Sequence, residues 1–316
     1  MYWLKLVRWK NLVIIFLTQL FAWICVVLPM QQYATRPLLL DSAHFLFLSL
    51  STVCIAAAGY IINDYFDLKI DVINKPDKVV LQKGIPVKMA IIAHTMLNVA
   101  ALWLAALVAL PGHHPEWMIV QLVCTALLWL YSTRFKRQFM SGNVVVALLT
   151  ALTIVVVMVY EPAMHQYAWK SYFINTGSGL APNPVWVLGV YTFFAFMLTW
   201  MREIVKDMED YKGDELEGCV TMPIRWGLQR SVRFVQMLGV LAVLPLVMAA
   251  VKLCMVGWWP LGIYAFAGLS VPLAWWLLYL QQKATTAHYH SSSKYIKIIM
   301  VLGIGSLVIY YFQAHA

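Results

Sequence analysis

The amino-acid sequence predicts an all-α, polytopic membrane protein. Hydrophobic residues make up 62% of the 316 residues and charged residues only 12%, whereas a soluble domain contains about 25% charged residues. The apolar residues form long runs, and the basic residues are concentrated in every second loop between those runs. The chain therefore has no room for a separate soluble domain, and we expect residues 1–316 to form one transmembrane domain.

Nine apolar runs have the length of a membrane span, which needs about 17–25 residues. Their predicted limits are 11–30, 42–62, 89–110, 115–132, 143–160, 184–201, 234–251, 258–281 and 298–314. The first run follows a short basic segment, as it would in a signal peptide. Since no convincing small-residue cleavage site follows that run, we expect a retained first helix.

The Lys and Arg residues predict the orientation, because they are enriched in cytoplasmic loops. If the N-terminus is cytoplasmic, only Arg36, Lys170 and Lys252 of the 23 basic residues fall outside. The net charge of +9 thus belongs to residues that border spans, and it does not indicate nucleic-acid binding. We expect an integral inner or plasma membrane protein with its C-terminus outside.

The acidic residues are concentrated in two predicted cytoplasmic segments, after the second and the sixth span. Acidic residues have little influence on topology, so orientation does not explain this clustering. In the first segment, Asn63, Asp67 and Asp71 are each four residues apart and share one face of a helix. Asp64 points about 100° away from Asn63.

The second segment repeats the pattern. Glu203, Asp207, Asp210 and Asp214 are separated by steps of four, three and four residues, which again predicts one helical face. The two segments lie four spans apart, which suggests two related four-helix halves plus one added helix.

Stacked carboxylates repel each other, and a fold keeps them when a cation lies on them. Oxygen ligands favour a hard cation such as Mg²⁺. A single acidic cluster at a helix end is as easily explained by solvation, but two paired clusters beside basic residues suit a metal-bound diphosphate. A diphosphate with an apolar tail would place its head at the cytoplasmic rim and its tail among the helices. We therefore expect the active site to face the cytoplasm.

The two acidic motifs also carry a family resemblance. The pattern Asn63-Asp64-x-x-Asp67-x-x-x-Asp71 resembles the first motif of the UbiA-type membrane prenyltransferases, and Asp207-x-x-Asp210-x-x-x-Asp214 resembles the second. The stretch from Tyr131 to Lys136 is similar to the Tyr/Lys motif of that family, and Gly142-Asn143 and the segment 218–227 also fit. The resemblance covers essentially the whole chain. Within the family, the segments around Glu203 and Asn74 are most similar to the branch that contains digeranylgeranylglyceryl phosphate synthase and chlorophyll synthase.

The resemblance implies nine helices around a central cavity, Mg²⁺ as cofactor, an isoprenyl diphosphate donor of geranylgeranyl-like length and a lipid or aromatic acceptor. The metal ligands that it implies are Asn63, Asp64, Asp67, Asp71, Asp207, Asp210 and Asp214. The implied diphosphate contacts are Lys136, Arg134, Lys206, Arg202 and Lys78. The implied catalytic residues are Asp67, Asp71, Asp207, Asp210 and Tyr131.

Other functions stay open at this point. A terpene cyclase with the same fold, or a prenyltransferase for haem or quinone precursors, would carry the same acidic motifs. A transporter would place its charges at mid-membrane, whereas the spans here are nearly free of charge. A scaffold without chemistry would not need two dense acidic faces. The expected partners are the diphosphate donor, a hydrophobic acceptor and membrane lipids.

Overall fold

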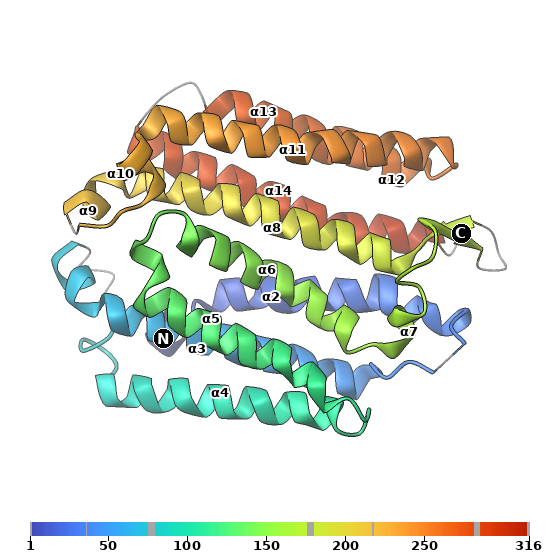
Figure 1. Cartoon of the computed structure of the whole chain (residues 1–316), viewed down its shortest axis with the longest axis horizontal. Coiled ribbons are helices and arrows are strands. Elements are labelled where there is room, and N and C mark those ends of the chain that lie inside the picture. Colours follow the sequence, from blue (N-terminus) through green and yellow to red (C-terminus); the bar gives the residue numbers. More distant parts are fainter. Residues whose placement is uncertain are drawn as a thin grey trace. The chain divides into compact units, whose positions relative to one another are not determined.

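A computed structural model describes residues 2–35, 37–74, 80–175, 180–216, 218–280 and 285–314. They are almost entirely helical (Figure 1), which confirms the all-α prediction. Within these residues, nine helical segments are long and apolar enough to cross a membrane: Trp9–Gln32, Ser42–Leu68, Val87–Ala109, Pro115–Thr133, Ser141–Val159, Pro184–Glu209, Leu228–Met255, Trp259–Leu280 and Thr286–Ala314. Each overlaps one predicted span. The sixth, the seventh and the ninth extend furthest beyond their predicted limits, because more polar turns continue the helix past the apolar run.

The chain divides into two compact units, which are described separately. The first unit comprises residues 1–136 and 152–188, and the second comprises residues 137–151 and 189–316. The expectations of a single domain, of two related four-helix halves and of a central cavity stay predictions.

The first unit contains most of the N-terminal helices. Its elements are α1 (Tyr2–Leu6), α2 (Trp9–Ala22), the π-helical η1 (Trp23–Val27), the 3₁₀ turn η2 (Leu28–Gln32), α3 (Ser42–Asn74), α4 (Val87–Ala109), η3 (Pro115–Met118), α5 (Ile119–Thr133), most of η4 (Phe135–Arg137), the end of α6 (Ser141–Val159), α7 (Pro162–His165), β1 (Phe173–Asn175), β2 (Leu180–Pro182) and the start of α8 (Pro184–Glu209). The two strands pair antiparallel.

Helix α3 is the central element of this unit, since it packs against α2, α4 and α5 (Figure 1). Gly59 allows α5 to approach closely, because a Cβ added there would lie 2.7 Å from Leu128. His94 of α4 approaches the carbonyl of Ala58 at 3.0 Å through Nδ1, and Asn98 lies 3.2 Å from the other ring nitrogen. These polar groups satisfy each other within a span, where unpaired groups are costly.

A buried carboxylate connects two segments of the first unit. Glu161 is fully buried and caps α7 by accepting a hydrogen bond from the amide of Ala163. It also accepts hydrogen bonds from the amides of Leu39 and Leu40, at 3.4 Å and 2.9 Å. The side chain thereby joins the segment before α3 to the segment after α6.

The second unit contains the C-terminal helices. Its elements are the start of α6, most of α8, α9 (Tyr211–Leu216), α10 (Met222–Trp226), α11 (Leu228–Met255), α12 (Trp259–Ile263), the π-helical η5 (Tyr264–Ser270), α13 (Val271–Leu280) and α14 (Thr286–Ala314). Figure 1 shows α11 beside α13 at the top of the view.

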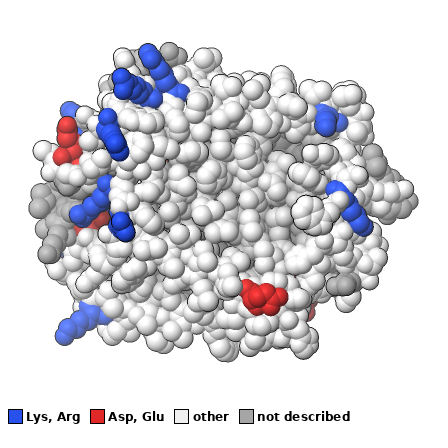
Figure 2. All heavy atoms as spheres, viewed as in Figure 1, with Lys and Arg blue, Asp and Glu red and all other residues white. Residues whose placement is uncertain are grey.

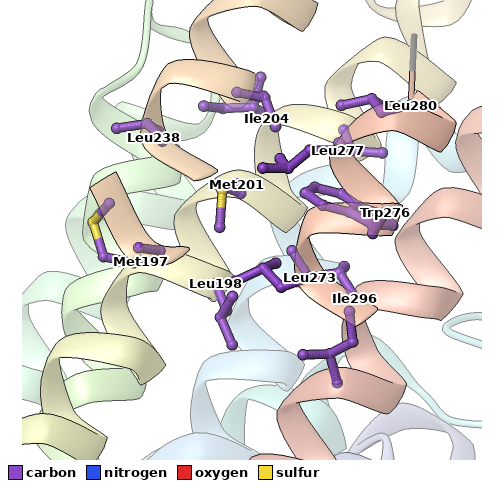
Figure 3. Close-up of a cluster of buried hydrophobic side chains, with 14 of the residues drawn as sticks. Met197, Leu198, Met201, Ile204, Leu238, Leu273, Trp276, Leu277, Leu280 and Ile296 are labelled. Atoms are coloured by element: carbon purple, nitrogen blue, oxygen red, sulfur yellow. The ribbon is translucent and has the colours of Figure 1, made fainter. Parts of the chain in front are cut away.

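Four helices of this unit share one hydrophobic core. Figure 3 shows Met201 and Ile204 of α8 facing Leu238 of α11 and Trp276 and Leu277 of α13, with Ile296 of α14 below. The Trp276 indole donates a hydrogen bond of 3.0 Å to the carbonyl of Ser292. This core holds the end of α8, and therefore the acidic segment that follows, in a fixed place within the unit.

Charged side chains are sparse on the face drawn in Figure 2, where uncharged atoms cover the middle of the helices and the charges gather toward the helix ends. This distribution is typical of an integral membrane protein.

Candidate active site

The first acidic motif lies near the end of α3, in the first unit. Asn63 Nδ2 donates a hydrogen bond of 2.9 Å to Oδ2 of Asp67, one turn further along. Both residues are only 8% exposed. The four-residue spacing thus brings an amide and a carboxylate together on one face of α3. The side chain of Asp71, which was predicted to extend this face, lies outside the described residues, as does Lys78.

Lys136 provides the positive charge for this face. Its Nζ donates to Oδ2 of Asp67, the same oxygen that Asn63 binds. Lys136 belongs to η4, a short turn that follows the C-terminal end of α5. The turn crosses back toward α3 because α5 packs along α3 and ends beside the motif. The structure therefore unites three of the predicted site residues.

Asp64 points to a different partner. Its Oδ1 accepts a hydrogen bond of 2.8 Å from Nη2 of Arg8, whose guanidinium also lies over the Tyr60 ring at 4.9 Å. Tyr60 and Asp64 are four residues apart and share a face of α3, about 100° from the face of Asn63 and Asp67. Arg8 would therefore compete with a metal ion for the carboxylate of Asp64, which was predicted to be a metal ligand.

Arg8 was not predicted as a site residue, because a basic residue before the first span is explained by topology alone. It lies between α1 and α2 with a left-handed backbone (φ of 50°), which costs about 1–2 kcal/mol for a residue other than glycine. Burial lowers the pKa of the Arg8 guanidinium, but the charge of Asp64 together with Tyr60 and Tyr131 outweighs burial and raises that pKa overall. Arg8 is therefore held as a cation beside the motif.

Two further predicted residues lie on the side of α5. Tyr131 is half-buried in the last turn of α5 and is close enough to Arg8 to influence its pKa. Arg134 is exposed and occupies the C-cap position of α5. Phe66 and Trp129 meet edge to face with centroids 5.6 Å apart, so aromatic rings line α3 and α5 just before the charged residues.

The second acidic motif lies at the end of α8, in the second unit. Asn143 Nδ2 of α6 donates a hydrogen bond of 2.8 Å to Oδ2 of Asp207. Asn143 is 8% exposed. The sequence placed Gly142-Asn143 within a family-like stretch without giving Asn143 a role. Each unit therefore contains a carboxylate that receives a hydrogen bond from a buried asparagine amide.

The two predicted cations of α8 are bound to a carboxylate in the same helix. Glu203 accepts hydrogen bonds from Arg202 at 2.8 Å and from Lys206 at 2.9 Å and 3.0 Å. Nε of Arg202 is buried and has no hydrogen-bond partner among the described residues. These two predicted diphosphate contacts thus share Glu203 as their counter-ion.

The predicted helical face through Asp214 is interrupted. Helix α8 ends at Glu209, and α9 begins at Tyr211. Backbone bonds of 2.9 Å from Asp210 N to Lys206 O and of 3.0 Å from Asp214 N to Asp210 O continue the four-residue pattern across this break. Asp214 O in turn accepts from Cys219 N at 3.0 Å. The chain after α8 thus turns back toward α10 while it keeps the acidic residues in helical register.

We call Asn63, Asp67 and Lys136 the first half-site, and Asn143, Asp207 and Lys206 the second. The donor set of each suits a hard cation. Carboxylate and amide oxygens are the ligands that Mg²⁺ prefers, and the contact between Lys136 and Asp67 shows that the first half-site already holds a positive charge. Across the described residues, no three His, Cys, Asp or Glu side chains are close enough to hold a metal by themselves.

A known protein family matches most of the chain. The model of the UbiA prenyltransferase family matches residues 11–307. A digeranylgeranylglyceryl phosphate synthase from Methanosphaera stadtmanae is 31% identical over 195 residues, which are 61% of this chain and 62% of that protein. The matched parts span 53–62% of the length of the first three curated relatives.

Two solved structures share the fold. A structure from work on digeranylgeranylglyceryl phosphate synthase in membranes has a TM-score of 0.65 and 22% identity, and the match covers 99% of this chain and 98% of that chain. A UbiA homologue from Archaeoglobus fulgidus bound to DMAPP and Mg²⁺ has a TM-score of 0.57 and 15% identity, with 98% and 99% of the two chains covered. Because the family model matches nearly the whole length, from the first span to the last, this chain belongs to the UbiA prenyltransferase family.

Proposed function

We propose that this chain catalyses the Mg²⁺-dependent transfer of an isoprenyl group from a polyprenyl diphosphate to a glyceryl phosphate lipid within the membrane. The observation that carries this proposal is the pair of half-sites, each with a carboxylate bonded to a buried asparagine beside basic side chains. The lipid acceptor is supported by curated relatives named digeranylgeranylglyceryl phosphate synthase, and the donor class by the homologue bound to DMAPP and Mg²⁺.

Both half-sites act on the same diphosphate in this proposal. Asn63, Asp67 and Asp71 would hold one Mg²⁺, and Asp207, Asp210 and Asp214 would hold another. When bound, these ions withdraw charge from the diphosphate and so favour ionisation of the allylic carbon–oxygen bond. Asp64 is left out of this ligand set, because its Oδ1 is bonded to Arg8 and its side chain lies on another face of α3.

The basic residues position the diphosphate. Of the described residues we assign this role to Lys136, Arg134, Lys206 and Arg202, and we add Lys78 from the sequence pattern alone. Arginine and lysine form charge-assisted hydrogen bonds with phosphate oxygens, which are roughly twice as strong as neutral ones. Lys136 contacts Asp67 of the first motif, and Lys206 and Arg202 contact Glu203 one turn before Asp207, so all three cations lie beside the acidic segments.

Aromatic side chains protect the allylic cation. Phe66 and Trp129 lie next to the first half-site, and Tyr131 lies beside Arg8. The electron-rich faces of such rings stabilise a cation by about 0.5–2 kcal/mol each. They also exclude water, which would otherwise capture the cation as an alcohol. We place this site on the cytoplasmic side, in agreement with the distribution of the basic residues in the sequence.

The test is a direct assay of transfer. Purified protein is incubated with geranylgeranyl diphosphate, shorter isoprenyl diphosphates and candidate acceptors, and the products are identified by mass spectrometry. We expect a prenylated glyceryl phosphate lipid, no product with EDTA, and recovery with added Mg²⁺. Asp67→Asn and Asp207→Asn should each abolish transfer, whereas Asp41→Asn, which removes an exposed carboxylate at the start of α3, should not.

Two outcomes would contradict the proposal. Undiminished transfer with EDTA would exclude the metal-bound diphosphate. A cyclised or hydrolysed donor as the sole product, in the presence of every acceptor, would show that the same half-sites serve a cyclase or a hydrolase.

A further inference from the structure

A group of arginines in the second unit has no place in the chemistry described above. Arg225 lies in the last turn of α10, Arg230 lies in the first turn of α11, and Arg233 follows three residues later. All three residues are exposed. Figure 2 shows blue side chains gathered over the region where α10 joins α11.

The charges of these arginines are not neutralised within the described protein. Arg8, Lys136, Arg202 and Lys206 each contact a carboxylate, but in the described part of the chain Arg225, Arg230 and Arg233 form no ion pair. The first turn of α11 also contains no acidic residue. Arg230 lies in the first turn of α11, where the helix dipole disfavours a cation, and a bound external anion would offset this effect.

Arg225 is oriented for such a contact. Its guanidinium lies over the Phe139 ring at 5.2 Å, and Phe139 packs against Trp226 with centroids 4.9 Å apart. An arginine stacked on a ring is held in place while the N–H groups along its edge remain available to bind phosphate. Trp226 is 38% exposed and is of the residue type enriched at the membrane–water boundary.

The surface of α11 continues from the arginines as an apolar stripe. Arg230 and Arg233 are followed, at steps of three or four residues, by exposed apolar side chains on the same face of the helix. These are Met237 at 51% exposure, Val240 at 51%, Leu244 at 57%, Met248 at 65% and Val251 at 53%. We call the three arginines and this row the α11 stripe. It is cationic at one end and apolar for the remaining length of a membrane span.

We propose that the α11 stripe binds a phospholipid with an anionic phosphate head group, such as phosphatidic acid. The arginines bind the phosphate at the membrane surface, and an acyl chain lies along Met237, Leu244 and Met248. A free phosphate ion would use only the arginines and would gain nothing from the apolar row. No residue of the stripe belongs to either acidic motif, so this proposal does not depend on prenyl transfer.

The experiment is a lipid titration of the detergent-purified full chain, read by native mass spectrometry. Phosphatidic acid and phosphatidylcholine are titrated in parallel, and inorganic phosphate is added as a competitor. The test variant is Arg225→Gln/Arg230→Gln/Arg233→Gln. The control variant, Lys5→Gln/Lys10→Gln/Lys294→Gln, removes the same number of exposed positive charges elsewhere. Size-exclusion chromatography confirms that both variants remain folded.

A cation near an anionic lipid surface contributes about a fivefold change in affinity. We therefore expect the triple arginine variant to bind phosphatidic acid about a hundredfold more weakly and to bind phosphatidylcholine unchanged. The control variant should bind phosphatidic acid within a few-fold of the wild type. Equal losses in the two triple variants would overturn the proposal, because they would show a general charge effect. Displacement of phosphatidic acid by inorganic phosphate at similar concentrations would also overturn it, since the apolar row would then contribute nothing.

Discussion

Replacing Asn143 by alanine tests whether the buried amide controls Asp207. The substitution removes the 2.8 Å hydrogen bond from Nδ2 to Oδ2 of Asp207. A hydrogen bond to a charged group contributes about 1.5–3 kcal/mol. If this contribution is fully realised when Asp207 binds the metal-bound diphosphate, kcat/KM falls about 10- to 150-fold. Asn143→Asp should lower it further, because a second negative charge would face the carboxylate.

The assay measures initial rates of prenyl transfer over a range of donor and Mg²⁺ concentrations. Asn98→Ala is the control, because the amide of Asn98 also makes a side-chain contact within a span, but its partner is His94 of the same helix rather than an acidic residue. If Asn143→Ala lowers the transfer rate strongly at low Mg²⁺ and less at high Mg²⁺, the defect lies in metal binding at Asp207. A change of less than about twofold in kcat/KM would refute the reasoning, since the bond would then be structural only.

Three other perturbations follow from the packing. Gly239→Val should destabilise the second unit by about 1–3 kcal/mol, because an added Cβ would lie 2.2 Å from Leu277; thermal unfolding in detergent measures this. Glu161→Gln should flatten the pH dependence of the free energy of unfolding. Burial raises the pKa of Glu161 above its ordinary value of 4.5. The protonated side chain therefore stabilises the fold at low pH, and this stabilisation is lost as pH rises above 4.5 toward the folded-state pKa. The same unfolding measurement from pH 4 to 7 should show that slope in the wild type and not in the variant. Arg8→Gln and Asp64→Asn should change the free energy of unfolding with a coupling of about 0.2–1 kcal/mol in a double-mutant cycle, because Arg8 is partly exposed. Additive effects would show that the ion pair does not contribute to stability.

The spans and the family could be predicted because they depend on local composition. A run such as 42–62 is apolar whatever it packs against, and the structure confirms it as part of α3. The four-residue spacing of Asn63 and Asp67 is also a local property, and their side chains do meet.

The partners of these residues could not be predicted in the same way. Asn143 and Asp207 are 64 residues apart, and Arg8 and Asp64 are 56 residues apart. Both contacts depend on which helices pack together. The segment after Lys206 shows a second limit: its acidic spacing predicts an unbroken helix, but the chain turns after Glu209 to lead into α9 and α10. The spacing predicts which residues share a helical face, but it does not predict where the helix ends.

The contact between Lys136 and Asp67 has a consequence for the order of binding. A divalent ion bound to this carboxylate would compete for its charge with the Lys136 ammonium, which already balances it. The competition would be relieved if the lysine found another anion, and a diphosphate would supply one. Metal and donor should therefore bind together, so that the charge of Asp67 is balanced by Lys136 until the substrate binds.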